Sequence, residues 1–294
     1  MFPDFLPPAV RNLTEPTSIA LAQNLYVTDI TTPLSPQPIP TAAVRQGTGD
    51  PPILLLHGFD SSVFEFRRLL PLLATDRETL AVDLLGFGFT DRLTVSAIAC
   101  DTIKTHLYEF WKTEITRPMV LVGASMGGAA AIDFTLTYPE AVDRLILIGS
   151  AGIAKGPIVG KFLVPPFDYF AADFLRRPQV RKSISQTAYY DKTLNSADAQ
   201  LCAALHLAMP GWHRATIAFT KSGGYGSFRD RLHQIQQQTL ILWGRNDRIL
   251  GTRDAAQFEK AIDRSQLIWI DNSGHVPHLE KPQVTVQHIL DFVK

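Results

Sequence analysis

One short stretch constrains the fold of this chain more than any other: Gly123-Ala124-Ser125-Met126-Gly127 lies between an apolar run and a helical one. Residues 118–122 (PMVLV) predict a buried strand, and residues 128–134 (GAAAIDF) are rich in strong helix formers. In so tight a strand-to-helix turn, a side chain at position 123 or 127 would collide with neighbouring backbone. The Ser125 hydroxyl then lies at a helix N-terminus, where developing negative charge is favoured. The pattern predicts a nucleophile, with a simple helix cap as the alternative.

The rest of the chain repeats this order of strand and helix. Apolar strands are predicted at 53–56, 79–82, 119–122, 144–148, 239–243 and 266–270. Helices are predicted at 63–73, 95–111, 126–138, 252–262 and 284–293. Continuous apolar strands that alternate with amphipathic helices are typical of a parallel sheet covered on both faces. The predicted fold class is therefore α/β, with a mostly parallel, doubly wound sheet.

The predicted domain organisation follows from where this alternation stops. Residues 153–232 contain no apolar strand of this type and are dense in aromatic residues and paired arginines, which predicts an inserted helical cap. The core domain then comprises residues 41–152 and 233–294. Residues 1–40 form an N-terminal extension with proline-rich links, and edge strands are predicted at 25–28 and 41–46.

Charge and cysteine content exclude several classes of protein. Lys plus Arg and Asp plus Glu both number 28, and no basic stripe is present, so a nucleic-acid partner is not expected. Cys100 and Cys202 lie far apart without C-x-x-C spacing, which disfavours a disulfide framework or zinc site and predicts a cytoplasmic protein. No apolar run reaches the roughly 20 residues of a membrane span. The first residues also lack the basic start and apolar core of a signal peptide.

Two later loops supply the partners that Ser125 needs, because a hydroxyl is a poor nucleophile at neutral pH without a positioned base. His275 follows the last predicted strand and is the candidate base, and Asp247 follows the preceding strand and is the carboxylate that orients the imidazole. Residues that follow successive parallel strands emerge at the same carboxyl edge of the sheet, where ligands bind. Ser125, Asp247 and His275 are therefore predicted to form a catalytic triad, although each alone is also typical of an ordinary loop residue.

The sequence His57-Gly58-Phe59-Asp60 directly follows the first buried strand. Acyl transfer requires two backbone N–H donors aimed at the oxyanion of the tetrahedral intermediate. One is predicted to be the N–H of Met126, and the other the N–H of Phe59, with Gly58 letting the backbone turn towards the substrate. His57 is expected to brace this loop by hydrogen bonds, with a role as a second base as the alternative.

Together these segments resemble the α/β-hydrolase superfamily, in the serine-nucleophile branch with a helical cap after the sixth strand. The motifs that carry the resemblance are His57-Gly58-Phe59, Asp83-Leu84-Leu85-Gly86-Phe87-Gly88, Gly123-Ala124-Ser125-Met126-Gly127-Gly128, Gly244-Arg245-Asn246-Asp247 and Ser273-Gly274-His275. They span essentially everything after the N-terminal extension and occur in the family's order of Ser, Asp and His. The resemblance implies two-step acyl transfer through an acyl-enzyme, with no metal or organic cofactor. Asp83 is expected to be structural.

The predicted activity is hydrolysis of a carboxylic ester of a small to medium apolar substrate, by a monomer or homodimer. Dehalogenases and epoxide hydrolases of the superfamily are disfavoured, because they use an aspartate nucleophile. Carbon–carbon bond hydrolases of diketone-type ring-cleavage products share Ser-Met-Gly-Gly and the cap, so they remain an alternative. In that family a tryptophan often follows the histidine, whereas Val276 stands here. A ligand-sensing protein on the same fold is a further alternative.

The aromatic residues of the insertion are candidates for the substrate pocket, because ligand sites are mostly apolar with a few polar anchors. The alternative for each is that it only attaches the cap to the core. The candidates, within residues 162–219, are Phe162, Phe167, Tyr169, Phe170, Phe174, Tyr189, Tyr190, Trp212 and Phe219.

Overall fold

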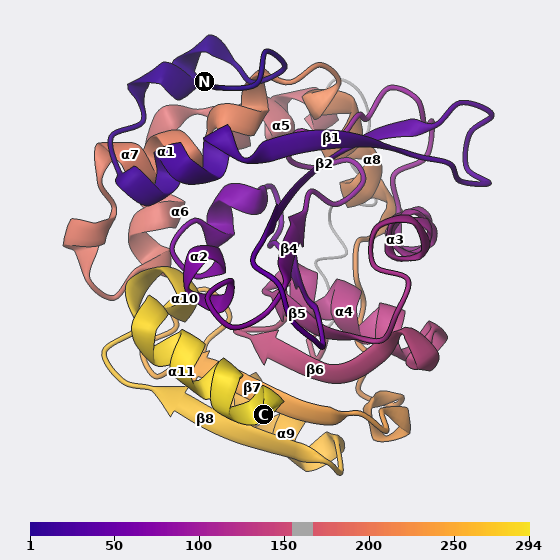
Figure 1. Cartoon of the computed structure of the whole chain (residues 1–294). Helices are drawn as coiled ribbons and strands as arrows, with labels where there is room; N and C mark the ends of the chain where they lie inside the picture. The colour runs from indigo at the N-terminus through magenta and orange to yellow at the C-terminus, as the bar shows by residue number, and fades with distance from the viewer. Residues whose placement is uncertain (155–166) are drawn as a thin grey trace.

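The structure is a computed structural model that describes residues 1–154 and 167–294 (Figure 1). In these residues eight strands form one sheet in the order β1-β2-β4-β3-β5-β6-β7-β8. β1 pairs with β2 and β2 with β4 in antiparallel fashion, and every other pairing is parallel. The predicted α/β class with a mostly parallel sheet is therefore confirmed. The strands are β1 Leu25–Ile30, β2 Ile39–Gln46, β3 Ile53–Leu56, β4 Thr79–Val82, β5 Met119–Ala124, β6 Val142–Ile148, β7 Gln238–Gly244 and β8 Ser265–Ile270.

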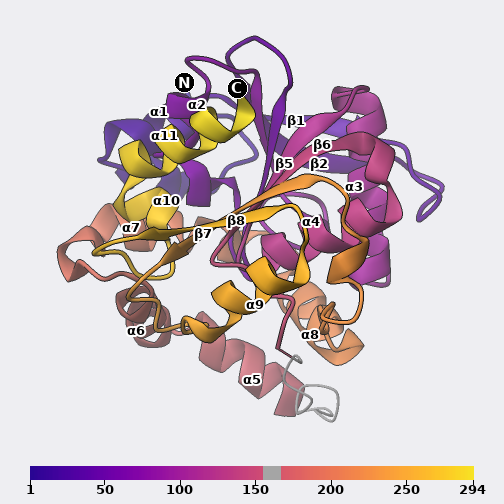
Figure 2. The same ribbon diagram turned by 90° about the horizontal axis from the view of Figure 1, so that it is seen from below.

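Alternate residues of each central strand point to opposite faces of the sheet, and each face has its own apolar core. In β3, Leu54 and Leu56 belong to one core, whereas Ile53 and Leu55 belong to the other. The first core includes side chains of α3 Cys100–Glu114, α4 Met126–Thr137 and α9 Arg253–Ala261. The second includes side chains of α1 Pro16–Gln23, α2 Leu70–Leu73 and α11 Pro282–Val293. Helices therefore cover both faces (Figures 1 and 2), as the continuous apolar strands require.

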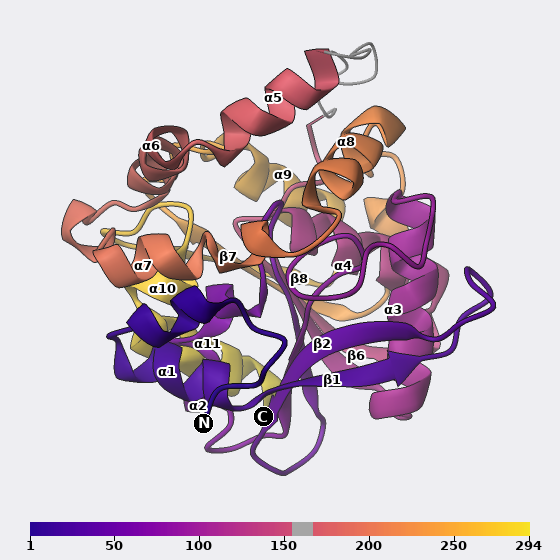
Figure 3. The same ribbon diagram turned by 90° about the horizontal axis from the view of Figure 1, so that it is seen from above.

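The chain leaves the sheet after β6 and returns at β7, and the described part of this insertion is helical. It contains α5 Phe167–Arg176, α6 Pro178–Ala188, α7 Ala197–Cys202 and α8 Trp212–Ser222. α5 lies at the outer edge of the molecule, and α7 lies beside α1 (Figures 2 and 3). β1 belongs to the sheet although it lies within residues 1–40, the segment expected to be an extension. Short 3-10 turns are Pro8–Asn12, Val63–Phe66, Pro139–Ala141, Lys192–Leu194, Leu205–Ala208 and Leu232–Gln234.

Two predicted helices begin or divide differently in the structure. The segment 63–73 divides into a 3-10 turn, Val63–Phe66, and α2, whose second residue is Pro71. A proline lacks the N–H that a continuous helix would use, but it suits the first helical turn. α3 begins at Cys100 rather than near residue 95, because Ala99 is extended and its N–H donates to the Thr102 hydroxyl at 3.0 Å. α10 Pro277–Glu280 is a single turn that leads into α11.

Candidate active site

Ser125 lies at a sharp turn between β5 and α4, with φ 52° and ψ −117°. A non-glycine residue at positive φ is costly and persists only where its surroundings impose it. Here the Ser125 N–H donates to the Ile148 carbonyl at 3.0 Å, and its own carbonyl accepts from Ala151 N at 2.9 Å. A Cβ at Gly123 would overlap the Gly127 carbonyl, and one at Gly127 would overlap the Leu56 carbonyl. Close backbone packing therefore requires both glycines, as the sequence predicts.

Asp247 and His275 follow β7 and β8, and their side chains meet at the carboxyl edge of the sheet. His275 Nδ1 lies 2.8 Å from Asp247 Oδ2, and both side chains are almost fully buried. The other carboxylate oxygen, Oδ1, accepts the N–H groups of Ile249 at 2.8 Å and Leu250 at 3.1 Å. The carboxylate is thus fixed by its own loop, and the imidazole is left with Nε2 for a second partner.

Ser125 and His275 both line a cavity of about 520 Å³ beneath the cap. The loop 58–61 forms another part of its wall, and residues of α6, α7 and the segment between them close it from the cap side. A Cβ added to Gly58 would lie only 3.3 Å from Ser125 Cβ, so this loop lies directly against the serine. Ser125, His275 and the expected oxyanion loop therefore lie around one cavity, and Asp247 reaches it through its contact with His275.

The two expected oxyanion donors flank Ser125. Met126 is the first residue of α4, so its N–H lies in the turn where a helix leaves its donors without an intrahelical acceptor. The preceding donor in the loop, Gly58 N, is already occupied by Glu65 Oε2 at 2.8 Å. Within the described residues, the Phe59 N–H donates no hydrogen bond. The Phe59 ring lies in an aromatic group with Phe87 and Phe219, at centroid distances of 5.8 and 5.9 Å.

His57 has its hydrogen bonds within this loop and the loop after β4. Its Nδ1 lies 2.8 Å from the Gly58 carbonyl, and its Nε2 accepts the Leu84 N–H at 3.1 Å. Burial lowers the pKa of His57 to about 4, so the neutral ring persists at neutral pH. Asp83 accepts the N–H groups of Val63 and Phe89 at 2.7 Å each, and burial raises its pKa to about 7. Both residues thus hold loops in place.

Asp60 connects the loop that contains Phe59 to the cap, a role that no sequence pattern predicts. Its Oδ1 accepts from Trp212 Nε1 at 2.8 Å and lies 3.1 Å from His206 Nε2, while Oδ2 pairs with Arg181 at 2.5 Å. Burial by itself raises the pKa of Asp60. The hydrogen bond and charge of His206, the charge of Arg181 and the Trp212 hydrogen bond outweigh burial and lower that pKa to about 2. Three separate parts of the cap therefore bind one carboxylate beside the expected oxyanion donor.

Two further buried carboxylates, Glu65 and Glu280, were also not foreseen. Glu65 binds Gly58 N and lies 3.3 Å from His278 Nε2. Burial tends to raise its pKa, but the neighbouring His278 and the Gly58 N–H lower it to about 2. Glu280 accepts from Gly274 N at 2.6 Å and from the cap residue Tyr190 N at 2.8 Å. Most of these contacts join residues that are distant in sequence, so no local sequence pattern predicts them.

The aromatic residues of the cap are distributed between the cavity and the surface. Tyr189 of the cap lines the cavity that contains Ser125, together with Phe59 of the core. Phe174 lines a second cavity, of about 320 Å³, between α5 and α8. Trp212 and Phe219 are buried against Asp60 and Phe59. Phe162 lies outside the described residues. The remaining four, all well exposed, are Phe167, Tyr169, Phe170 and Tyr190.

One match to a protein-family model is long enough to assign the chain to that family. The model for the alpha/beta hydrolase family matches residues 53–288. This chain belongs to the alpha/beta hydrolase family. The alpha/beta hydrolase domain-containing protein VTE7 of Arabidopsis thaliana is 35% identical over 300 residues, covering 99% of this chain and 90% of that protein. The 2-hydroxy-6-oxo-2,4-heptadienoate hydrolase of Pseudomonas putida is 27% identical, covering 84% and 90%.

Solved structures of alpha/beta hydrolases share the fold. A thermophilic esterase from Thermogutta terrifontis superposes with a TM-score of 0.77 at 24% identity, covering 91% of this alpha/beta hydrolase and 98% of the esterase.

In the described part of the chain, no three His, Cys, Asp or Glu side chains lie together in a group that could hold a metal ion. No helix in residues 1–154 or 167–294 is long and apolar enough to cross a membrane.

Proposed function

We propose that this alpha/beta hydrolase is a serine hydrolase that cleaves a carboxylic ester through an acyl-enzyme at Ser125. The observation that carries the proposal is the Asp247–His275 contact of 2.8 Å at a cavity that also contains Ser125 at its strained turn. A base oriented by a carboxylate, at the same cavity as a serine hydroxyl, is the arrangement that activates serine. A small-molecule ester fits a cavity of about 520 Å³.

The chemistry proceeds in two steps. His275 Nε2 takes the proton of Ser125 while Oγ attacks the ester carbonyl, and Asp247 stabilises the imidazolium that forms. The N–H groups of Phe59 and Met126 donate to the oxyanion. His275 then gives its proton to the departing alcohol, which leaves an acyl group on Ser125. A water molecule, deprotonated by His275, attacks that acyl group and releases the acid and the free serine.

A carbon–carbon bond hydrolase is the second candidate. The observation that favours it is the 27% identical Pseudomonas putida relative, which is a 2-hydroxy-6-oxo-2,4-heptadienoate hydrolase. The same serine, histidine and oxyanion donors serve both reactions, because each passes through a tetrahedral adduct of a carbonyl group. The bond that breaks depends on the substrate, so substrate profiling separates the two.

The nucleophile is tested with Ser125→Ala. The variant is expected to lose labelling by a fluorophosphonate probe and to lose p-nitrophenyl ester hydrolysis by at least about a thousandfold, because no other group replaces the attacking oxygen. Ser222→Ala is the control, since the Ser222 hydroxyl caps the end of α8 by donating to the Phe219 carbonyl and lies outside the cavity lining. Labelling of Ser125→Ala at the wild-type rate would contradict the assignment.

The reaction type is tested by measuring kcat/KM for p-nitrophenyl esters of increasing chain length beside a vinylogous diketone acid. A preference for esters, with a burst of p-nitrophenol equal to the enzyme concentration, supports the ester hydrolase. Faster cleavage of the diketone supports the second candidate. Tight binding of ligands with negligible turnover of both substrate types would instead favour a ligand-sensing protein.

A further inference from the structure

Asp60 directly follows Phe59, the expected oxyanion donor, in the loop after β3. Its φ of 49° lies in the left-handed region, which aspartate tolerates better than most residues that carry a side chain. Its carboxylate is buried, lines the cavity that contains Ser125, and binds three separate parts of the cap. The placement of the cap can therefore act on the main chain beside the Phe59 N–H.

The core fixes the start of this loop through the peptide group that carries the expected donor. The Gly58 N–H donates to Glu65 Oε2, and the Gly58 carbonyl accepts from His57 Nδ1, both at 2.8 Å. This peptide group is trans, so the carbonyl and the N–H, which belongs to Phe59, point in opposite directions. A single hydrogen bond to a carbonyl leaves a broad range of orientations open. The tilt of the Phe59 N–H therefore also depends on the residue that follows it.

The cap holds that next part of the loop. Among the described residues, every hydrogen bond made by residues 59–61 joins Asp60 to the cap. Trp212 Nε1 donates to Oδ1 at 2.8 Å. The Arg181 guanidinium binds Oδ2 at 2.5 Å and the main-chain carbonyl of the same aspartate at 3.3 Å. Hydrogen bonds within the core resume at Ser62.

The partners of Asp60 are themselves fixed in the cap. Arg181 also donates to the Ala203 carbonyl at 2.6 Å, which joins α6 to the segment after α7. Trp212 is the first residue of α8, is 3% exposed, and lies outside the cavity lining. An effect of Trp212 on the reaction must therefore pass through the structure around it rather than through contact with a substrate.

We propose that Asp60 is a positioning residue through which the cap fixes the Phe59 N–H at the oxyanion of the transition state. The inference rests on the proposed function, because attack by Ser125 generates that oxyanion. Oxyanion donors act by being held in place before the reaction. A loop that tilts therefore stabilises the transition state less, while the substrate still binds. The cap then contributes to the rate as well as to the pocket.

The readout is the ratio of kcat/KM for a p-nitrophenyl ester to that for its thiono analogue, in which sulfur replaces the carbonyl oxygen. Sulfur is a weak hydrogen-bond acceptor, so this ratio reports the oxyanion donors. Asp60→Asn retains a residue that tolerates positive φ and removes the charge that binds Arg181. It is expected to lower kcat for the ester about 10- to 100-fold with KM within about threefold, and to lower the ratio about tenfold or more.

Trp212→Phe removes one donor to Asp60 without changing the cavity lining. It is expected to lower the ratio by a smaller factor, about 3- to 10-fold. In the double variant with Asp60→Asn, it should add nothing to the loss, because both substitutions act through one carboxylate.

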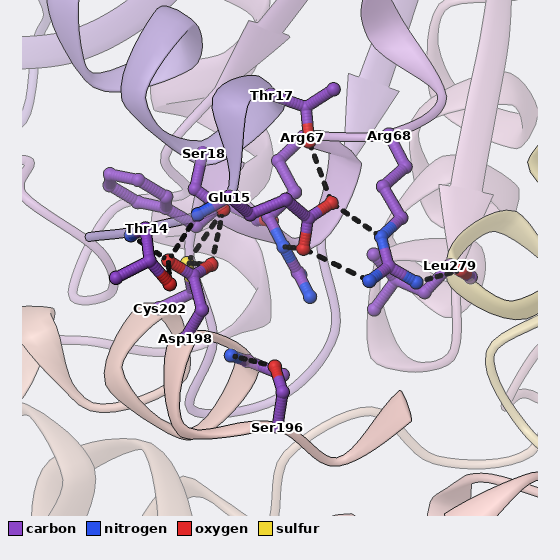
Figure 4. Close-up of polar contacts among 12 residues, drawn as sticks. Thr14, Glu15, Thr17, Ser18, Arg67, Arg68, Ser196, Asp198, Cys202 and Leu279 are labelled. Carbon is purple, nitrogen blue, oxygen red and sulfur yellow. Dashed lines mark hydrogen bonds and ion pairs between the residues drawn. The ribbon is translucent and has the colours of Figure 1, made fainter. Parts of the chain in front are cut away.

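Asp198→Asn is the matched control. Asp198 is another buried carboxylate of the cap, but it accepts from Thr14, Glu15 and Ser18 of the N-terminal segment (Figure 4). Its substitution should lower the melting temperature and leave the ester-to-thionoester ratio unchanged. Thermal denaturation shows that each variant is folded under the assay conditions. A wild-type ratio in folded Asp60→Asn, or an equal loss in Asp198→Asn, overturns the inference.

Fluorophosphonate labelling separates failure of this inference from failure of the proposed ester reaction, because the attacked phosphorus also carries an oxygen that the oxyanion donors bind. Asp60→Asn should lower the second-order rate of labelling at Ser125 about tenfold or more, whereas Asp198→Asn should not. If the wild-type protein is labelled but hydrolyses no ester, the ester reaction is wrong and the labelling rates decide the inference. Absence of labelling in the wild-type protein overturns both.

Discussion

Asp247 uses both of its carboxylate oxygens as hydrogen-bond acceptors. Oδ2 holds His275 Nδ1 at 2.8 Å, and Oδ1 is held by the N–H groups of Ile249 and Leu250. An oxygen on each side is required, because both neighbours donate hydrogen. Asparagine has only one oxygen, so it loses one of these contacts or presents its NH₂ group to a donor.

Asp247→Asn is therefore expected to lower kcat for ester hydrolysis about 10⁴-fold, by analogy with the serine-protease triad, since the imidazole tautomer and orientation are lost. Its KM should change little. Asp271→Asn is the control, because Asp271 is a largely exposed residue that pairs with Arg245 on the neighbouring loop. A kcat within threefold of wild type would place the orienting acid elsewhere.

The residues that sequence analysis missed share one property. Asp60, Glu65 and Glu280 act through partners that are distant in sequence, such as Asp60 with Trp212 and Glu280 with Tyr190. A sequence pattern predicts residues at strand ends, because the carboxyl edge of a parallel sheet gathers them. It does not predict which cap residue will lie above a given loop.

At the scale of elements, the strands and the turn at Ser125 were predicted closely because they depend on local chemistry. Continuous apolar runs give β3 and β5, and glycine at positions 123 and 127 allows the close backbone contact that the turn requires. Helix limits were less well predicted. Thr102 sets the beginning of α3 through one hydrogen bond, and Pro71 divides the segment 63–73. One side chain or one proline can therefore move a limit that periodicity cannot locate.

His106 on α3 makes the stability of this helix against the sheet dependent on pH. Its ring is buried, its Nε2 lies 2.8 Å from the Thr41 hydroxyl in β2, and burial lowers its pKa to about 4. An unfolded histidine binds a proton near pH 6.5, whereas the folded one stays neutral until about pH 4. The unfolded state thus binds more protons between these values, so stability falls as the pH is lowered through this range.

His106→Gln, which retains a donor for Thr41, is expected to reduce the loss of unfolding free energy between pH 7 and pH 4.5 by up to roughly 3 kcal/mol. Urea denaturation at the two pH values measures the difference. The exposed His233 provides the control variant, His233→Gln, which should retain the wild-type pH dependence. An equal loss in His106→Gln and wild type would show that His106 titrates normally in the folded state.

At the scale of the whole molecule, the N-terminal segment joins the cap to the core. Leu6, Val10, Leu13 and Leu21 pack in the same apolar core as the cap residue Cys202. In Figure 3, α1 lies against α7, and α7 contributes Ala199 and Cys202 to the cavity wall. The segment expected to be an extension therefore supports one side of the candidate active site.

Asp198 of α7 makes several hydrogen bonds between the cap and the N-terminal segment. It accepts from Thr14 N at 2.5 Å, Glu15 N at 2.9 Å and the Ser18 hydroxyl at 2.6 Å, and it is 4% exposed. Asp198→Ala leaves these buried donors without an acceptor, so it is expected to lower the free energy of unfolding by about 2–4 kcal/mol. The loosened α7 wall should also raise KM for esters more than it lowers kcat.

The matched control is Asp191→Ala, another cap aspartate, which is exposed and caps a short turn by accepting from Thr193 N at 3.0 Å. Loss of that cap should cost about 1 kcal/mol and leave KM unchanged. Urea denaturation and ester kinetics on both variants make the comparison. If Asp198→Ala is no less stable than Asp191→Ala and has the wild-type KM, the hydrogen bonds of Asp198 to the N-terminal segment do not hold α7 in place.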